Sequence, residues 1–285
     1  MMRRSFASVL LLLAACTVTS APPDANPTGP GAGAPSPGTT VSPGTTGSGT
    51  PGPRGSPQKG PQPGSASYPE LAGVGAMATS YLRASPARSL LVEVDWMSGR
   101  KPSSSALAHL ESILRRELVK PDGVEVRFGA EMTTSRSTWT VDDMVEAERQ
   151  FRALRSGGAR ATMWIAFVGG SFAENDSALG AAFTASAAVI FRDRISDAAS
   201  ALLLASEIER SVLVHEAGHL LGLVNIGYRS GIDHEDAAHP HHSNNPDSVM
   251  YWAVEDLSIR NLLTGGPPDD FDAADRADLA MLRNS

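Results

Sequence analysis

Residues 215–225 read HEAGHLLGLVN, and this stretch decides how the rest of the chain is interpreted. In an α-helix, residues four apart lie on one face, so His215 and His219 can direct both imidazoles at a single ion. Glu216 lies beside them, where its carboxylate can reach a water on that ion. Two neutral imidazoles, a water and a carboxylate are what metal-assisted hydrolysis of an amide requires. The stretch therefore predicts a zinc-dependent hydrolytic site on a helix.

The residues on both sides of this stretch are apolar. SVLV (211–214) precedes it, and LLGLV occupies 220–224, so we expect the helix to be largely buried. Ionisable groups inside an apolar helix need a partner, and a bound metal supplies one. Gly222 lies three residues after His219, where a glycine can adopt positive φ and turn the chain out of the helix. The flanks thus favour a metal site over three solvated surface residues.

The stretch resembles the signature of the metzincin clan of zinc endopeptidases, HExxHxxGxxH followed by a methionine-containing turn. His215, Glu216, His219 and Gly222 match its fixed positions, and Asn225 stands where the clan has its third histidine. An asparagine carbonyl oxygen is a poor zinc ligand beside imidazole. The resemblance therefore requires a third ligand from elsewhere in the sequence.

A second segment supplies a candidate for that ligand. HSNNPDSVMY (242–251) resembles the matrixin segment in which the third zinc histidine is followed by a serine and, eight residues after the histidine, by the turn methionine and a tyrosine. This resemblance implies that His242 is the third ligand, displaced from position 225 by an insertion of 17 residues. It also implies that Met250 forms the hydrophobic floor beneath the histidines and that Tyr251 lines the pocket for the substrate residue after the scissile bond.

Other residues of the same region remain candidates for the third ligand. The alternatives are His234, His239, His241 and Asn225, the last of which could coordinate weakly or through water. The polar residues of segment 234–239 could also hold a second ion, although a solvated polar loop is the more usual meaning of such a cluster.

The N-terminal part of the chain carries features of export. Residues 1–16, MMRRSFASVLLLLAAC, have a positive start and an apolar run from Val9 to Leu13 that is too short to span a bilayer. The small-small-Cys ending resembles the lipobox of bacterial lipoprotein signal peptides, which implies that Cys16 is lipidated and anchors the protein to a membrane outside the cytoplasm. The alternative is an ordinary secretory signal in which Cys16 has no special role.

Composition divides the remaining sequence into two parts. Residues 17–68 are almost entirely Pro, Gly, Ser, Thr and Ala, with too little apolar surface to offset the entropy of ordering the backbone, so we expect a flexible linker. Residues 69–285 are long enough for one domain with a substantial core. The net charge of −7 and the lack of a basic run with interleaved aromatics argue against a nucleic-acid partner. We expect a monomer.

Hydrophobic periodicity predicts an α/β (α+β) domain. Strands are expected at 88–99, 123–132 and 160–170, the last of them central because it is more continuously apolar. Amphipathic helices are expected between them, at 103–118 and 141–154. Segment 178–193 favours two short strands at the sheet edge, where unpaired backbone groups could hold an extended peptide; the alternative is a structural hairpin with no role in binding.

The C-terminal half completes the predicted architecture. One or two helices are expected over 196–224, and a capped helix over 269–282 with Leu279 and Leu282 facing inward. The order of elements predicts a mixed, mainly parallel twisted sheet covered by helices. The metzincin resemblance adds an active-site helix and a C-terminal subdomain that contains the methionine turn.

These patterns together predict a lipid-anchored zinc endopeptidase that hydrolyses extracytoplasmic proteins or peptides, with Glu216 as general base and then proton donor. The main alternative is a catalytically inactive, metal-binding surface adhesion or interaction module of the same fold, in which Glu216 would have little use. A third is a hydrolase that acts on a non-peptide amide. Many matrixins block their zinc with a propeptide cysteine; the single cysteine here is Cys16, so any latency must arise differently.

Overall fold

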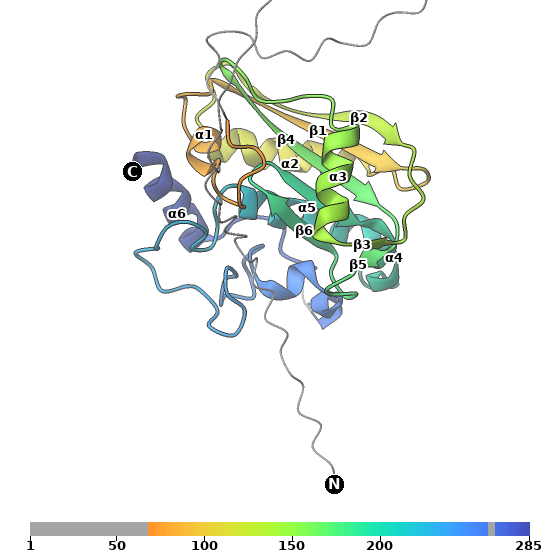
Figure 1. Ribbon diagram of the computed structural model, residues 1–285. Coiled ribbons are helices and arrows are strands. Elements are labelled where there is room, and N and C mark those ends of the chain that lie inside the picture. Colours follow the sequence, from red (N-terminus) through yellow and green to blue (C-terminus); the bar gives the residue numbers. More distant parts are fainter. Residues whose placement is uncertain (1–67, 262–265) are drawn as a thin grey trace, which may run out of the picture. The chain divides into compact units, whose positions relative to one another are not determined.

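The computed structural model describes residues 68–261 and 266–285. The predicted signal segment, Cys16 and all but the last residue of the predicted linker lie outside the described residues. None of the described helices combines the length and the apolar character that a membrane span requires. The described chain forms a five-stranded sheet covered by helices, with a two-stranded sheet beside it (Figure 1).

The main sheet has the strand order β2-β1-β4-β7-β6. Its strands are β1 (Ser89–Met97), β2 (Val124–Met132), β4 (Arg160–Val168), β6 (Gly180–Thr184) and β7 (Ala187–Phe191). β1, β2, β4 and β7 are parallel, whereas β6 runs antiparallel to β7 and ends the sheet. β4 is central and buried from Ala161 to Val168. The predicted α/β class, the mixed sheet and the central position of the third strand are therefore confirmed.

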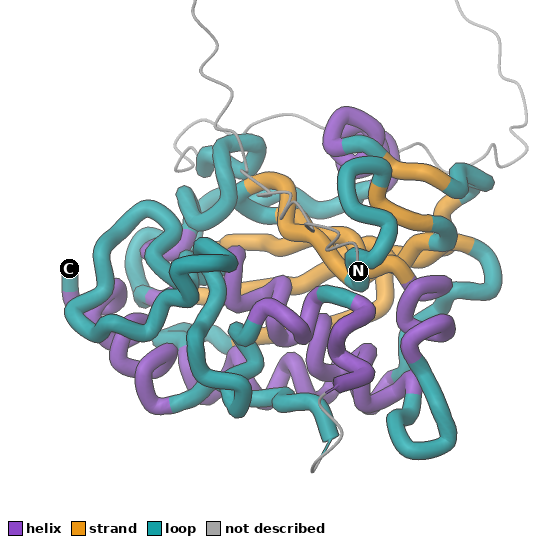
Figure 2. The backbone as a smooth tube through the Cα atoms, turned by 90° about the horizontal axis from the view of Figure 1, so that it is seen from below, coloured by secondary structure: helices purple, strands orange, loops and turns teal. Residues whose placement is uncertain are grey.

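Side chains of β4 alternate between two apolar cores, one on each face of the sheet. Met163 and Ile165 pack with residues of α2 (Ser104–Glu117) and α5 (Ala205–Leu220), whereas Trp164 and Ala166 pack on the other face with α3 (Val141–Phe151). Figure 2 shows the strands as a layer with helices on both sides. This arrangement follows from the period of two in a strand, which directs successive side chains to opposite faces.

The first two helices after β1 begin at caps that the sequence supplies. The Ser103 hydroxyl accepts a hydrogen bond from the N–H of Ala106 at the start of α2. Thr140 and Asp143 form a reciprocal capping box at the start of α3. At the C-terminus, α6 (Ala273–Asn284) begins behind Asp272, and Leu279 and Leu282 are buried as expected.

Several elements differ from the expected boundaries or were not expected. The helical region 196–224 is two helices, because α4 (Arg192–Ala198) ends before a largely exposed loop and α5 begins at Ala205. The short elements α1, β3, β5, η1 and η2 were not predicted. They are α1 (Ala78–Leu82), β3 (Thr138–Trp139), β5 (Ser171–Phe172), η1 (Trp252–Glu255) and η2 (Leu257–Asn261). Elements of two to five residues are too short to show a hydrophobic period.

The insertion after Gly222 is a folded loop whose two ends are joined through one carboxylate. Gly222 has φ +93° and ends the helical region, as predicted. Asn225 has φ +57°, accepts the N–H of Ser230 and donates to the Glu235 carboxylate at 2.7 Å. The other oxygen of Glu235 accepts the N–H of His241 at 2.9 Å. Asparagine tolerates this left-handed conformation, so Asn225 closes the loop in the position where the signature has a histidine.

Candidate metal centre

Three histidines and one glutamate direct ligand atoms into one space. His215 and His219 come from α5, His242 from the end of the insertion and Glu255 from η1, and their ligand atoms lie within 4.8 Å of one another. The Nε2 atoms of His215 and His219 are 3.0 Å apart. No other grouping of this kind occurs in residues 68–261 and 266–285. The structure thus brings together the three histidines that the sequence nominated and adds a fourth donor.

The hydrogen bonds of the histidines fix which ring nitrogen faces this space. In each ring the Nδ1 atom contacts a backbone carbonyl oxygen: Val249 for His215 (2.6 Å), Leu223 for His219 (3.0 Å) and Pro240 for His242 (3.0 Å). A carbonyl oxygen only accepts, so Nδ1 carries the proton in the neutral ring and Nε2 offers a lone pair. Three lone pairs therefore converge, which is the arrangement that a cation requires.

Two further observations are consistent with metal binding at this point. Nε2 of His242 is buried and has no partner in hydrogen-bond geometry, although Oε1 of Glu255 lies 3.0 Å away. The His242 and Glu255 side chains therefore lie side by side, as two ligands of the same metal ion do. Burial lowers the pKa of His219 to about 4, against the opposing effect of Glu255, so that its ring is neutral and free to coordinate near neutral pH.

The donor separations measured from Glu255 are close to those around a tetrahedral zinc ion. With ligand distances of about 2.0–2.2 Å, tetrahedral zinc holds its donor atoms roughly 3.3 Å apart. The Glu255 oxygens lie 3.0, 3.4 and 3.8 Å from the Nε2 atoms of His242, His215 and His219. Imidazole and carboxylate are both donors that zinc accepts. The site is therefore a metal site consistent with zinc.

Glu216 lies next to the metal ligands but is not one of them. Its side chain is fully buried, and neither carboxylate oxygen has a partner in hydrogen-bond geometry. Burial raises the pKa of Glu216 well above its ordinary value, the negative charge of Glu255 adds to the rise, and the N–H of Ala182 opposes it. A buried carboxyl group without a partner is costly to the fold, which points to a role other than stability.

The space for the Glu216 carboxylate is made by a glycine on the edge strand. α5 and β6 are in contact along the sheet edge (Figure 1). A Cβ atom added at Gly180, the first residue of β6, would lie 2.4 Å from Oε1 and 2.8 Å from Cγ of Glu216. Gly180 is thus the residue whose lack of a side chain admits the carboxylate between the helix and the strand.

Met250 lies against α5. It is fully buried, and its sulfur lies against Gly218, because a Cβ added at Gly218 would be 2.3 Å from that sulfur. The preceding residue, Val249, supplies the carbonyl oxygen that orients His215. Tyr251 is half-buried and packs against Trp252 with ring centroids 5.7 Å apart. The turn therefore supports the helix and its first histidine without offering a ligand.

The other proposed ligands are engaged elsewhere. His234 is buried and contacts the Asp278 carboxylate of α6 at 2.8 Å. His239 contacts Asp236 at 2.7 Å and stacks on Trp252 with ring centroids 4.2 Å apart. His241 Nδ1 contacts the carbonyl oxygen of Val224, and Asn225 closes the insertion. These alternatives to His242, and the second ion over 234–239, do not correspond to a ligand grouping in the described residues.

Comparisons with known proteins add little to this geometry. No protein-family model and no curated protein matches the sequence. Among solved structures, the chain is similar to archaemetzincin from Methanopyrus kandleri, at 14% identity and a TM-score of 0.48, over 70% of this chain and 98% of that one. It is also similar to metalloproteinase-II from Bacteroides fragilis, at 11% identity and a TM-score of 0.40, over 73% of this chain and 61% of that one. Similarities this low carry no functional argument, so the function has to be inferred from the site itself.

Glu255 is the site residue that the sequence did not reveal. It follows Met250 by five residues, within the apolar run YWAVED, and no spacing rule connects it to the histidines. Its place is set by backbone pairing, because its carbonyl oxygen accepts the N–H of Leu179 at 2.7 Å, next to β6. The acidic pair Glu255 and Asp256, directly after apolar residues, is the one signal that could have drawn attention to it.

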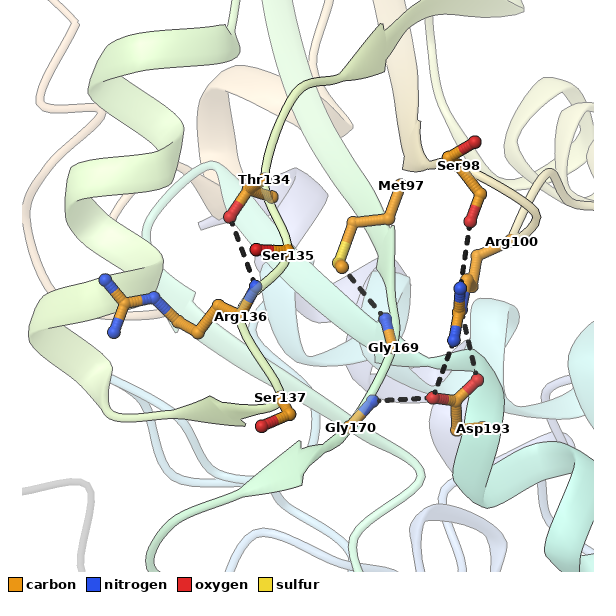
Figure 3. A pocket seen from close by; sticks show the side chains of 10 residues that line it. All are labelled: Met97, Ser98, Arg100, Thr134, Ser135, Arg136, Ser137, Gly169, Gly170 and Asp193. Carbon is orange, nitrogen blue, oxygen red and sulfur yellow. Dashed lines mark hydrogen bonds and ion pairs between the residues drawn. The ribbon is translucent and has the colours of Figure 1, made fainter.

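A cavity of 320 Å³ lies at the C-terminal ends of β1 and β4 and shares no residue with the metal ligands (Figure 3). Its walls include Ser98, Gly169 and two arginines. Arg100 is paired with Asp193 at 3.2 Å, and Arg136 with an aspartate of α3 at 2.8 Å. Both charges are already balanced, so the cavity presents no unpaired group that would select a ligand.

Proposed function

We propose that this protein is a zinc-dependent endopeptidase of the metzincin type, with a matrixin-like third-ligand segment. The observation that carries the proposal is the buried, unpartnered Glu216 carboxyl group directly beside three converging imidazoles. A site that only bound a metal would have no use for this group, whereas hydrolysis of an amide needs a base next to the metal.

In the proposed reaction His215, His219 and His242 hold the zinc. Zinc bound there would polarise the scissile carbonyl and lower the pKa of a coordinated water to about 7. Glu216 accepts a proton from the attacking water and returns it to the leaving nitrogen. A carboxyl group beside the metal can perform both transfers, because it accepts a proton as the carboxylate and donates one as the acid.

The edge strand supports a polypeptide substrate. Within the described residues no strand pairs with the outer side of β6, and its first residue, Gly180, lies against Glu216. An extended peptide that added to this edge would pass the base and the metal with its backbone hydrogen-bonded. We further propose that Cys16 anchors the monomeric protein to a membrane and that its substrates are extracytoplasmic proteins or peptides; the support is the sequence pattern of residues 1–16.

One observation favours a second candidate function. With Glu255 the site has four protein donors, and structural zinc sites are four-coordinate without an open position. A catalytically inactive metal-binding module of the same fold would show this donor set. The position of Glu216 distinguishes the two candidates, because the inactive module gains nothing from an unpartnered buried carboxyl group.

Removal of the metal tests the proposal. Dialysis of the full chain against 1,10-phenanthroline should abolish cleavage of casein and of a fluorogenic peptide library, and one equivalent of zinc should restore it. The isomer 1,7-phenanthroline, which does not chelate, is the matched control and should leave cleavage unchanged. A protein that binds one zinc per chain and cleaves no member of the library would contradict the endopeptidase assignment.

Replacing Gly180 tests the placement of the base. Gly180→Ala should lower kcat/KM by roughly tenfold to a hundredfold, because the added methyl group would displace the Glu216 carboxylate and misplacement by about 1 Å can cost that much. Zinc affinity should change little. Gly157→Ala is the control, since a Cβ there meets nothing within 4 Å. Equal rates for both variants would show that Gly180 does not position the base.

A further inference from the structure

We propose that Glu255 is a reversible gate on the metal: its carboxylate occupies the fourth donor position in the resting protein and leaves it when a metal-directed ligand or substrate binds. The proposal rests on the proposed function, because it assigns to the protein a latent state that the peptidase must leave. It also explains how a chain without a propeptide cysteine could keep its metal site closed.

The Glu255 carboxylate lies close to all three histidines. Its oxygens lie 3.0 Å from Nε2 of His242, 3.4 Å from His215 and 3.8 Å from His219. It therefore faces all three metal-directed nitrogens at once, from the side that the histidines leave open. A neutral histidine whose Nδ1 carries the proton cannot donate from Nε2, and a cation bound between the four groups would give each of these nitrogens and the carboxylate a partner.

With Glu255, the number of protein groups that face the metal position rises from three to four. Catalytic zinc sites have three protein ligands and keep the fourth position for water or substrate, whereas a fourth protein ligand closes the site. His215, His219 and His242 already supply three. Glu255 therefore takes the position that a substrate carbonyl or water would need, and catalysis requires that it withdraw.

The backbone of Glu255 is held more firmly than its side chain. The backbone on both sides is fixed, because its own carbonyl oxygen accepts the N–H of Leu179 and Leu257 donates to the carbonyl oxygen of Ser177 at 3.0 Å. Asp256 forms an antiparallel bridge with Ala178 in the same segment. The side chain, in contrast, is 24% exposed, and its ion-pair contacts among residues 68–261 and 266–285 are with the three histidines. Rotation of the side chain alone can therefore open the site while the backbone stays in place.

The backbone pairing also places the gate where a peptide would arrive. Residues 177–179, which hold the Glu255 segment, lead directly into Gly180 at the start of β6. A peptide that added to the outer side of β6 would lie beside both Glu216 and the gate. The free energy of binding the peptide backbone could thus displace the Glu255 carboxylate. This is an induced fit, in which substrate binding rearranges the site.

Two binding measurements with opposite expected directions test the gate. In the full chain, Glu255→Gln should weaken zinc binding at least about tenfold in a chelator competition, since even residues outside the ligand set change metal affinity by about 10–100-fold. The same variant, loaded with zinc, should bind acetohydroxamate at least about tenfold more tightly than wild type. A gate that leaves the open state about 10% populated reduces the apparent affinity of a metal-directed ligand by that factor.

Two further variants make the result interpretable. Glu255→Asp keeps the charge but shortens the side chain, so it should shift both affinities in the same directions as Glu255→Gln, and it serves if that variant does not fold. Glu174→Gln removes one exposed carboxylate from the loop before β6 and should change neither affinity. Loss of folding would weaken binding of both zinc and acetohydroxamate, whereas loss of the gate changes them in opposite directions.

The outcomes separate the gate from the peptidase. Unchanged zinc affinity, or unchanged acetohydroxamate affinity, in Glu255→Gln and Glu255→Asp would overturn the gate, and peptide cleavage by wild type would still support the proposed function. If both affinities shift as expected while neither wild type nor Glu255→Gln cleaves any peptide, the gate on the metal stands and the peptidase function fails. Faster cleavage by Glu255→Gln together with both shifts supports the two proposals at once.

Discussion

Glu216→Gln is expected to lower kcat/KM for peptide cleavage by about 10²–10⁴-fold while one zinc per chain remains bound. The amide has nearly the shape of the carboxyl group, so it fits the space that Gly180 leaves, but it cannot accept a proton from water. Zinc binding should be unaffected because Glu216 is not among the four metal-directed side chains. The measurement is steady-state cleavage of a fluorogenic peptide, paired with metal analysis of the same sample.

The same variant should show no loss of stability. The Glu216 carboxyl group is fully buried, so its replacement by a neutral amide of similar shape removes the cost of burying a charge. The thermal midpoint of Glu216→Gln should therefore equal or exceed that of wild type, as is common where a site is built at the expense of stability. Glu146→Gln, on the exposed face of α3, is the control and should leave cleavage unchanged. Wild-type cleavage by Glu216→Gln would remove the base from the proposed mechanism.

His242→Ala is expected to weaken zinc binding by at least about 10–100-fold and to reduce cleavage in proportion. The imidazole contributes one of the three lone pairs that converge on the metal, and its Nε2 is buried without a partner in hydrogen-bond geometry. Without it the site keeps two histidines, and the neighbouring Glu255 loses its closest contact, at 3.0 Å. Competition with a chromogenic chelator measures the change in affinity.

His239→Ala is the matched control for this prediction. His239 belongs to the same insertion, but it stacks on Trp252 and contacts Asp236 instead of the metal ligands. Its replacement should leave zinc affinity within about twofold of wild type, because no metal-directed atom is lost. If His239→Ala weakened zinc binding as much as His242→Ala does, the insertion would act through its folding, and His242 would no longer be distinguished as the ligand.

Much of the fold could be predicted because its long elements are strongly periodic. β1, β2, β4, α2, α3 and α6 lie within a few residues of the predicted ranges. The predictions were least complete for elements whose boundaries depend on tertiary contacts and not on hydrophobic periodicity. α4 begins at Arg192, directly after β7 and with no loop between them, so no turn residue in the sequence marks the boundary. Cys16, the linker and the membrane anchor stay predictions, since they lie outside the described residues.

The sequence by itself determined the half of the site that local geometry controls. His215, Glu216 and His219 share one helix, whose period places two imidazoles on one face and a carboxyl group beside them. The segment from His242 to Met250 is short enough for its spacing to indicate a ligand and its supporting turn. In both cases the informative residues are close in the chain, so their spacing in the sequence predicts their relative positions in space.

Only the tertiary structure decided which further groups lie at that site. Gly180 admits the Glu216 carboxylate, and Glu255 faces the three histidines, because β6 and η1 are both brought against α5. These contacts join residues 36 to 40 positions apart in the chain. No local period encodes such a contact; it exists because the sheet edge and the backbone pairing at Leu179 place both residues beside the helix.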